Sequence, residues 1–500
     1  MQLAAAACRT VDHAFDRAFG ATHNPLRQLG ALATGTFCLA AASGAVLYVV
    51  FDTSVAGAYQ SIDAFSRAPG SAGSIVRGLH RYAADAFVLL TLAHLAREWL
   101  LGRFKAFRRF SWLTGVLLLP LLLVTAIVGF WLNWDRLAQY SALATAEWLD
   151  ALPLLASPLA RNFLSGVSDR LFSLLVFVHV GLPLLLVFGV WVHVQRLGRP
   201  RVLPTSAAAI GTLASLLALA LVLPVRSQGA ADLATVPAAL ALDWLVLFVH
   251  PLADATSPAA TWLVAGALLA LLVGLPFASP RIGAAPAVVD PAHCNGCRRC
   301  ADDCPYTAIT MVPHPNRRPG MQLAQVDPLL CAACGICAGS CPSAAPALHR
   351  TGVTSGIDLP GASLDELLGS LTRGLAVHPG VQVVFGCAHG ADVPAAAPGA
   401  LVLKTTCAGM LPPSFVEEAL RRGAAGVLVA GCREGGCEFR FGQDWTAQRL
   451  ARGREPRLRS QVPCEHWAAV WADRGDEDRV AAAIARLASR AVAATSGVAA

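Results

Sequence analysis

Two cysteine-rich runs decide how this chain is organised: CNGCRRCADDCP at residues 294–305 and CAACGICAGSCP at residues 331–342. In each run two residues separate the first three cysteines, and a fourth cysteine follows after three more residues and precedes a proline. A [4Fe–4S] cluster needs four thiolates, and tight turns between close cysteines let one run wrap one face of the cube. The repeated spacing therefore predicts two [4Fe–4S] clusters.

The ligands are expected to cross between the runs, because with this spacing the fourth cysteine ligates the other cluster. One predicted ligand set is Cys294, Cys297, Cys300 and Cys341, and the other is Cys331, Cys334, Cys337 and Cys304. Two zinc sites are the alternative, but zinc ribbons lack the third cysteine and the trailing Cys-Pro. The stretch resembles the two-[4Fe–4S] ferredoxin family, which implies an α+β domain over residues 281–350.

The composition divides the chain into a membrane part and a cluster-bearing part. Of the 500 residues 55% are hydrophobic and 14% are charged, and the apolar residues concentrate before residue 280. Eight of the 15 cysteines lie in the two runs, which favours metal binding in a reducing compartment over disulfides. The net charge of +7 does not indicate nucleic-acid binding, because the basic residues cluster in short loops between apolar segments.

Six apolar segments are long enough to cross a bilayer, which takes about 20 residues each. They are residues 29–51, 75–100, 112–132, 171–194, 206–225 and 260–277. Arginines concentrate in alternate loops, so the positive-inside rule predicts a multi-pass protein of the bacterial inner membrane with both termini in the cytoplasm. Residues 11–19 are amphipathic and are interpreted as a helix on the membrane surface, with a soluble amphipathic helix as the alternative.

Four histidines in two of these segments share one spacing. His80 and His94 are fourteen residues apart in the second segment, and so are His179 and His193 in the fourth. Fourteen residues are nearly four helical turns, so each pair shares a helix face and spans about 21 Å. Ionisable residues inside a membrane are costly and usually functional, although a single one is more often a hydrogen-bonded core residue. Two helices side by side would form two stacked His–His sites.

Glycines in the first and third segments repeat the same interval. Gly30 and Gly44 are fourteen residues apart, as are Gly115 and Gly129. Glycine lets a flat macrocycle approach a helix backbone closely, but it is also common in membrane helices. The glycines therefore support a macrocycle site without establishing it.

With Asn24-Pro25-Leu26 and Arg77 three residues before His80, these residues resemble the cytochrome b family of quinol-oxidising bc complexes. The resemblance covers residues 10–200 and implies a di-haem four-helix core at 1–200, two haem b groups and possible assembly as a homodimer. It also implies that His80 and His179 hold the outer haem, that His94 and His193 hold the inner one, and that Arg77 lies near a propionate.

Residues 201–280 are interpreted as two further transmembrane helices with a degenerate quinol-site loop. The family has a Pro-Glu-Trp-Tyr segment there, whereas this chain has Leu242-Asp243-Trp244-Leu245. Asp243 is a weak candidate proton acceptor at a quinone site, and a solvated loop aspartate is the plainer reading. His250 is expected to be a loop residue without a role. Rieske-type boxes are absent from the sequence, so bifurcated quinol oxidation within this chain is not expected.

The last third has an α/β pattern after two expected linkers, at 281–291 and 342–378. Residues 381–385, 400–404 and 426–430 are predicted strands, and 414–422 a helix. The remaining candidate ligands follow strands, where open α/β sheets place their sites. They are Cys387, Cys407, Cys432 and Cys437.

This module, at residues 375–490, resembles the delta subunit of methyl-viologen-reducing hydrogenase. The matching residues are Cys387 before Gly390-Ala391-Asp392, Cys407-Ala408-Gly409, Phe415, Ala419 and Gly423, and Gly431-Cys432 before Cys437. The resemblance implies one [2Fe–2S] cluster and electron exchange with a soluble flavoprotein, either of the heterodisulfide-reductase type or linked to pyridine nucleotides. The family usually has two cysteines near the first strand where this chain has Cys387 alone, and four unrelated buried cysteines are the alternative.

The predicted fold is multidomain: an all-α transmembrane di-haem bundle, an α+β ferredoxin-like domain with two clusters, and a small α/β domain. The predicted function is an oxidoreductase subunit that passes electrons between a soluble flavoprotein and membrane quinone. The sequence lacks Gly-x-Gly-x-x-Gly and Walker motifs, which places flavin chemistry on a partner. A redox sensor or scaffold without turnover is the alternative. Electron flow in either direction, and a quinone site beside either haem, remain open.

Overall fold

The fold was analysed in a computed structural model that describes residues 2–152, 167–278, 285–315, 320–349 and 352–497. The chain divides into two compact units. Unit 1 comprises residues 1–195 and 200–280, and unit 2 comprises residues 196–199 and 281–500. The predicted linker at 281–291 begins outside the described residues, and its described part is not all linker, because Val288 and Val289 form a short strand that pairs with residues 357–358.

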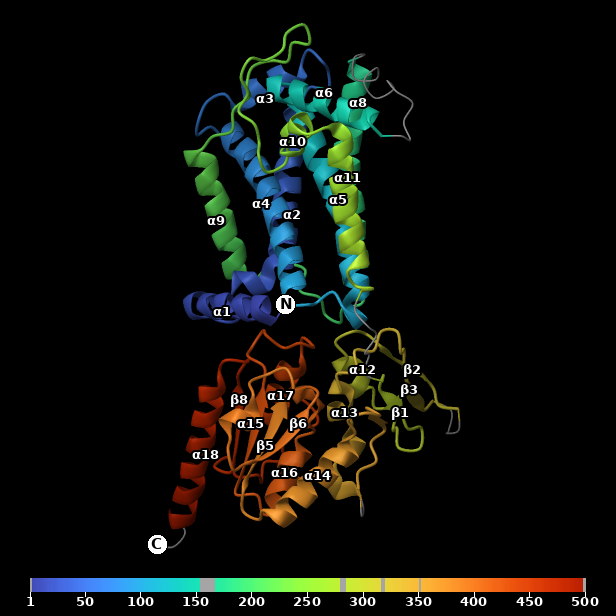
Figure 1. The fold of residues 1–500 in the computed structure, drawn as a ribbon, viewed down its shortest axis with the longest axis vertical. Helices are drawn as coiled ribbons and strands as arrows, with labels where there is room; N and C mark the ends of the chain where they lie inside the picture. Colours follow the sequence, from blue (N-terminus) through green and yellow to red (C-terminus); the bar gives the residue numbers. More distant parts are fainter. Residues whose placement is uncertain (1, 153–166, 279–284, 316–319, 350–351, 498–500) are drawn as a thin grey trace. The chain divides into compact units, whose positions relative to one another are not determined.

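Unit 1 is helical, as predicted. Its helices are α1 (Gln2–Phe19), η1 (Pro25–Gln28), α2 (Leu29–Val50), α3 (Ala58–Ser66), α4 (Ala72–Leu100), η2 (Ala106–Arg108), α5 (Arg109–Leu132), α6 (Arg136–Asp150), α8 (Asp169–Val194), α9 (Ser206–Val222), α10 (Val249–Ala255) and α11 (Pro258–Gly274). Helix α2 packs along α4, and α5 packs along α8. Figure 1 shows the long helices side by side, with the short helices α3, α6 and α10 near one end of them.

Each of the six predicted transmembrane segments lies on a helix, but the helices differ in kind. Among the described residues, three helical segments are both long and apolar enough to cross a membrane: Pro25–Val50, Ala106–Leu132 and Asp169–Val194. Helix α4 is long, but it carries several charged residues, including Arg81 and Asp85. Helices α9 and α11 are apolar and have 17 residues each, which is near the lower limit for a span.

The first helix turns its acidic side toward the protein. Asp12, which is 4% exposed, pairs with Arg97 of α4 at 2.8 Å, and Asp16 pairs with Arg27 at 2.7 Å. Val11 and Phe19 are exposed. Exposed apolar side chains on a helix are suited to contact with a membrane surface.

The Asn24-Pro25 motif has a structural reason. The Asn24 side chain is fully buried, accepts from the backbone N–H of Leu26 at 2.9 Å and so caps η1. Its amide also donates to Asp16 at 2.7 Å and thereby joins α1 to the start of α2.

One prediction for unit 1 is wrong, and two of its helices were not predicted. His250 was expected in a loop, but it lies in α10, is 1% exposed and contacts the hydroxyl of Ser141 at 2.9 Å. Helices α3 and α6 were not predicted. Their apolar residues cover the end of the bundle, as the buried Ala138, Ala142 and Ala146 of α6 illustrate.

The first part of unit 2 is built from two similar halves. Its elements are β1 (Val288–Val289), α12 (Arg299–Asp303), β2 (Ile309–Pro313), β3 (Gln322–Val326), α13 (Ile336–Ser340), η3 (Pro342–Ala344), η4 (Pro346–Leu348) and β4 (Ile357–Asp358). β2 and β3 pair antiparallel, as do β1 and β4. The short helices α12 and α13 each follow a residue with positive φ, Arg298 or Gly335.

The second part of unit 2 is a four-stranded parallel sheet in the order β6-β5-β7-β8. Its strands are β5 (Gln382–Cys387), β6 (Leu401–Thr405), β7 (Gly426–Gly431) and β8 (Trp467–Trp471). Its helices are α14 (Leu364–Val377), α15 (Val393–Ala396), η5 (Ala408–Met410), α16 (Ser414–Arg421), α17 (Gly442–Leu450) and α18 (Glu477–Gly497). α15 and α18 pack on one face, and α14 and α16 on the other.

The predicted linker at 342–378 is wrong: its first part contains η3, η4 and β4, and its second part folds as α14. Ser363 forms a capping box with Glu366 at the start of this helix, and its leucines are buried. The strand β8, which completes the sheet, was not predicted.

The ferredoxin-like part and the sheet part of unit 2 pack closely at two glycines. A Cβ on Gly339 of α13 would overlap the carbonyl oxygen of Gly409 in η5. We therefore expect Gly339→Ala to destabilise unit 2 by about 1–3 kcal/mol, the usual cost of overpacking. Thermal unfolding of the detergent-solubilised protein measures this cost. Gly361→Ala is the control, since its Cβ would meet nothing within 4 Å, and equal unfolding of the two variants would contradict the packing.

Candidate cofactor sites

The structure brings His80 of α4 and His179 of α8 together, with ring centroids 6.2 Å apart. Imidazole nitrogens ligate metals at about 2 Å, so two imidazoles on opposite sides of one iron have centroids roughly 6 Å apart. The separation therefore fits a bis-histidine haem.

The hydrogen bonds of these two rings set the tautomer that iron needs. Nδ1 of His80 lies 2.8 Å from the carbonyl oxygen of Ala40, and Nδ1 of His179 lies 3.0 Å from that of Thr125. A carbonyl oxygen accepts and cannot donate, so each Nδ1 carries the proton. The lone pair is then on Nε2, the usual arrangement in a metal-binding histidine with an oriented ring.

The second histidine pair has similar surroundings. Nδ1 of His193 lies 3.1 Å from the hydroxyl of Thr114, and His94 lies close enough to His193 for their charges to interact. The ring geometry thus brings His80 and His179 close together, while His94 and His193 lie against Gly30 and Gly115 respectively.

Each of the four predicted glycines lies against one of these histidines. A Cβ would lie 2.9 Å from the His80 ring if placed on Gly44, 3.6 Å from His94 on Gly30, 3.0 Å from His193 on Gly115 and 2.7 Å from His179 on Gly129. At Gly44, Gly115 and Gly129 the missing Cβ makes room for an imidazole ring, whereas a Cβ on Gly30 would make only ordinary contact with His94. From the sequence, these glycines were expected to make room for a macrocycle.

Arg77 is 8% exposed and donates to three neutral oxygens, on Ser66, Asn133 and Ser227, at 2.8–3.1 Å. Buried cations are usually paired with an anion. The hydrogen bonds of Arg77 in the described structure therefore leave its charge available to an anionic group such as a haem propionate.

Asp243 is not a free loop carboxylate. It forms an ion pair with Arg81, which also pairs with Asp85 at 2.7 Å, and it accepts from the backbone N–H of Val246 at 2.7 Å. Arg81 follows His80 in the sequence, so these charges lie near the predicted outer haem ligand.

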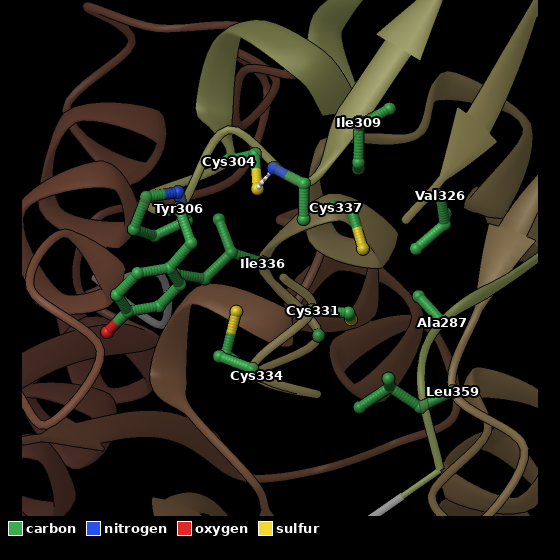
Figure 2. Close-up of a pocket in the computed structure, with 14 residues that line it drawn as sticks. Ala287, Cys304, Tyr306, Ile309, Val326, Cys331, Cys334, Ile336, Cys337 and Leu359 are labelled. Carbon is green, nitrogen blue, oxygen red and sulfur yellow. Dashed lines mark hydrogen bonds between the residues drawn. The ribbon is translucent and has the colours of Figure 1, made fainter. Parts of the chain in front are cut away.

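The eight cysteines of the two runs line two separate pockets. One pocket is lined by Cys304, Cys331, Cys334 and Cys337 together with apolar side chains such as Ile309, Val326 and Leu359, as Figure 2 shows. The other is lined by Cys294, Cys297, Cys300 and Cys341. These are the two crossed sets that the sequence spacing predicted.

The chemistry of the sulfur atoms fits iron–sulfur clusters. Backbone N–H groups of Ala308 and Ala333 donate to the sulfur atoms of Cys304 and Cys331 at 3.4 Å, the kind of contact that tunes cluster potentials. Burial, together with the nearby sulfur charges, raises the pKa of Cys300 to about 12. Such a thiol stays protonated until a metal centre displaces its proton.

The zinc alternative has less support. Among the described residues, no three His, Cys, Asp or Glu side chains converge as ligands of a single metal ion. A cubane binds each of its four thiolates at a different iron, so convergence on one point is not required.

The four remaining cysteines meet at the carboxyl edge of the parallel sheet. Cys387 ends β5, while Cys407 and Cys432 follow β6 and β7, and all three are buried, as is Cys437. The sulfur atoms of Cys387 and Cys432 are 3.8 Å apart. Two thiolates on one tetrahedral metal with bonds of ~2.3 Å lie about 3.8 Å apart, so these two sulfur atoms are spaced as two ligands of one iron would be.

Cys407 and Cys437 both lie beside one glycine. A Cβ on Gly442, the first residue of α17, would overlap the Cys407 sulfur and lie 3.3 Å from the Cys437 sulfur. Glycine therefore leaves space beside both sulfur atoms, and a two-iron cluster takes two thiolates on each iron.

The comparisons with known proteins agree with this division of the chain. The family model for cytochrome b/b6/petB matches residues 20–199, the 4Fe-4S dicluster domain matches 293–345, and the delta subunit of methyl-viologen-reducing hydrogenase matches 388–492. The chain thus carries these three domains in this order, which confirms the resemblances seen in the sequence.

Similarity to individual proteins concentrates in the first domain. Cytochrome b6 of Gracilaria tenuistipitata var. liui is 28% identical over 171 residues, which cover 33% of this chain and 78% of that protein. A solved structure described as "Hyperthermophilic respiratory Complex III" gives a TM-score of 0.41 at 22% identity, covering 50% of this chain and 74% of that one. The domain matches identify a multi-pass membrane protein that transfers electrons through haem b and iron–sulfur clusters.

The glycines that lie against the histidine rings give a direct test of the predicted haem sites. We expect Gly129→Val to halve the haem content, because its side chain would displace the His179 ring from the Thr125 carbonyl. The pyridine haemochrome assay measures haem per chain, with two expected before the change and one after it.

Gly181→Val on the same helix as His179 is the control, since a Cβ there would meet nothing within 4 Å. Full haem content in Gly129→Val, or equal loss in both variants, would contradict the assignment.

Proposed function

We propose that this chain is the membrane-bound electron-transfer subunit of a quinone-linked oxidoreductase. It would carry electrons through one [2Fe–2S] cluster, two [4Fe–4S] clusters and two b haems. The observation that carries the proposal is the coexistence, in one chain, of crossed cysteine sets lining two pockets and of paired histidines with oriented rings. The protein's part is to hold the centres and tune their potentials, while the cofactors supply the redox chemistry.

The haem ligands would have the roles that the resemblance to cytochrome b implies, and the structure suggests how the four remaining cysteines would divide between two irons. His80 and His179 would hold the outer haem, with Arg77 near its propionate, and His94 and His193 the inner haem. Cys387 and Cys432 would share one iron of the [2Fe–2S] cluster, and the remaining pair, Cys407 and Cys437, the other. The carbonyl contacts of His80 and His179 and the 3.8 Å sulfur separation support these roles.

The partner on the soluble side would be a flavoprotein, of the heterodisulfide-reductase type or linked to pyridine nucleotides. The matched delta-subunit domain and the lack of dinucleotide-binding motifs in the sequence support this. The protein would lie in a bacterial inner membrane with both termini in the cytoplasm, in contact with lipid and quinone, and would form a homodimer through its cytochrome b part. The arginine-rich alternate loops support that orientation.

Quinone would react near the outer haem, beside the group formed by Asp243, Arg81 and Asp85. Asp243 and Asp85 both pair with Arg81, which follows His80 in the sequence. Their carboxyl groups would accept protons when quinol is oxidised or donate protons when quinone is reduced. Transfer between the two haems then moves charge across the bilayer. Moving one electron across a membrane potential of 100 mV changes its free energy by about 2.3 kcal/mol. The direction of electron flow therefore depends on the reduction potential of the donor and on the membrane potential.

The test is His80→Ala in proteoliposomes that contain a short-chain quinone, with reduced methyl viologen as the soluble donor. We expect the clusters and the inner haem to be reduced while quinone turnover falls to background. His23→Ala, at an exposed position before η1, is the control.

Persistent turnover in His80→Ala would move the quinone site to the inner haem. Absence of quinone turnover in the unmodified protein, with all centres loaded, would overturn the proposed function and favour a sensor or scaffold.

A further inference from the structure

One buried arginine contacts segments from all three iron–sulfur sites. Arg449 lies in α17, and its side chain is 0% exposed. It donates to Asp303 at 2.6 Å, to the hydroxyl of Ser340 at 2.6 Å and to the carbonyl oxygen of Gly409 at 2.8 Å. Ser340 in turn donates to the same carboxylate oxygen of Asp303 at 2.6 Å.

The positions of these partners in the sequence are what matter. Asp303 directly precedes Cys304, and Ser340 directly precedes Cys341. These are the two cysteines that cross to the opposite cluster. Gly409 follows two residues after Cys407, a ligand of the predicted [2Fe–2S] site.

The network carries a net positive charge. Asp303 also forms an ion pair with Arg454, so two guanidinium groups share one carboxylate. Arg454 lies over the ring of Trp445 at 3.7 Å, and the indole N–H of Trp445 donates to the backbone oxygen of Asp303 at 3.2 Å. Because Arg449 and Asp303 are buried, water screens this charge weakly.

One N–H group of Arg449 makes no hydrogen bond in the described structure. Its Nε–H is buried and has no hydrogen-bond partner among the residues that the structure describes. Buried donors are rarely left unpaired, and cluster sulfur atoms accept hydrogen bonds that raise reduction potentials.

We propose that Arg449 is a positioning residue for the three iron–sulfur sites and that its charge, held by Asp303, raises the reduction potentials of both [4Fe–4S] clusters. Each cubane takes up one electron and becomes more negative, with no bond formed and no proton transferred. A fixed positive charge stabilises the reduced form more than the oxidised form. The network thus poises the two cubanes together and fixes the crossed cysteines in place.

This inference rests on the proposed function for the identity of the clusters, but its test does not depend on turnover. The experiment is a redox titration of the full-length, cluster-loaded protein followed by electron paramagnetic resonance. Total iron and sulfide are measured in parallel, so that loss of a cluster is separated from a change in its potential.

In Arg449→Met, we expect the one-electron reduction of the cubanes to become at least tenfold less favourable, which corresponds to 59 mV. In Asp303→Asn, loss of the negative charge should shift the potentials in the opposite direction. Arg449→Lys, which keeps the charge but loses the fork of donors, should shift them less than Arg449→Met. Arg457→Met, with a side chain that is 57% exposed in the same unit, is the control and should leave them unchanged.

Opposite shifts in Arg449→Met and Asp303→Asn support the inference, since a purely structural residue would not produce them. Unchanged potentials with full iron content, or shifts of the same sign in both variants, overturn it. If Arg449→Met loses its clusters, Asp303→Asn decides: a rise in potential supports the inference, while no rise, or loss of iron there too, overturns the electrostatic role. Failure of quinone turnover with these shifts intact would count against the proposed function alone.

Discussion

The crossing of Cys304 and Cys341 between the two cysteine runs is the constraint on which the second unit depends. Each pocket is complete only when a cysteine from the other run reaches it, so the two halves must fold around each other. The residues before these cysteines, Asp303 and Ser340, are both buried against Arg449 of the sheet part. The α/β part thereby supports the geometry of the clusters as well as carrying its own cysteines.

In the first unit, too, side chains from separate segments meet at each predicted cofactor site, and these segments are helices. The predicted ligands His80 and His179 come from α4 and α8, and the groups that orient their rings come from neighbouring helices: the Ala40 carbonyl from α2 and the Thr125 carbonyl from α5. Small residues on α2 and α5 let the rings approach, as the short distances at Gly44 and Gly129 indicate. In both units, each site is closed by segments far apart in the sequence, which couples cofactor binding to folding.

The sequence was sufficient where chemistry requires particular residue types at fixed spacing. The cysteine runs, the paired histidines and the cysteines after strands could all be located, because thiolates and imidazoles in these patterns have few other uses. The structure places these residues together, although their roles as ligands stay predictions.

What the sequence could not predict depends on long-range contacts. The carbonyl groups that orient His80 and His179 belong to the backbone and leave no trace in residue type. Arg449 is one arginine in a polar helix, and only its packing against Asp303 distinguishes it from an exposed one. Asp243 looked like a loop carboxylate because its partner Arg81 lies in a distant helix, and α14 was read as linker because its leucines lack a visible partner before the fold is known.

We propose that one chain holds one [2Fe–2S] cluster, two [4Fe–4S] clusters and two b haems. A redox titration of the purified protein, with haems followed by absorbance and clusters by electron paramagnetic resonance, tests it most directly. We expect two haem transitions, two [4Fe–4S] signals and one [2Fe–2S] signal for each chain. A single haem transition, or the absence of either cubane in protein with its full iron content, would contradict it.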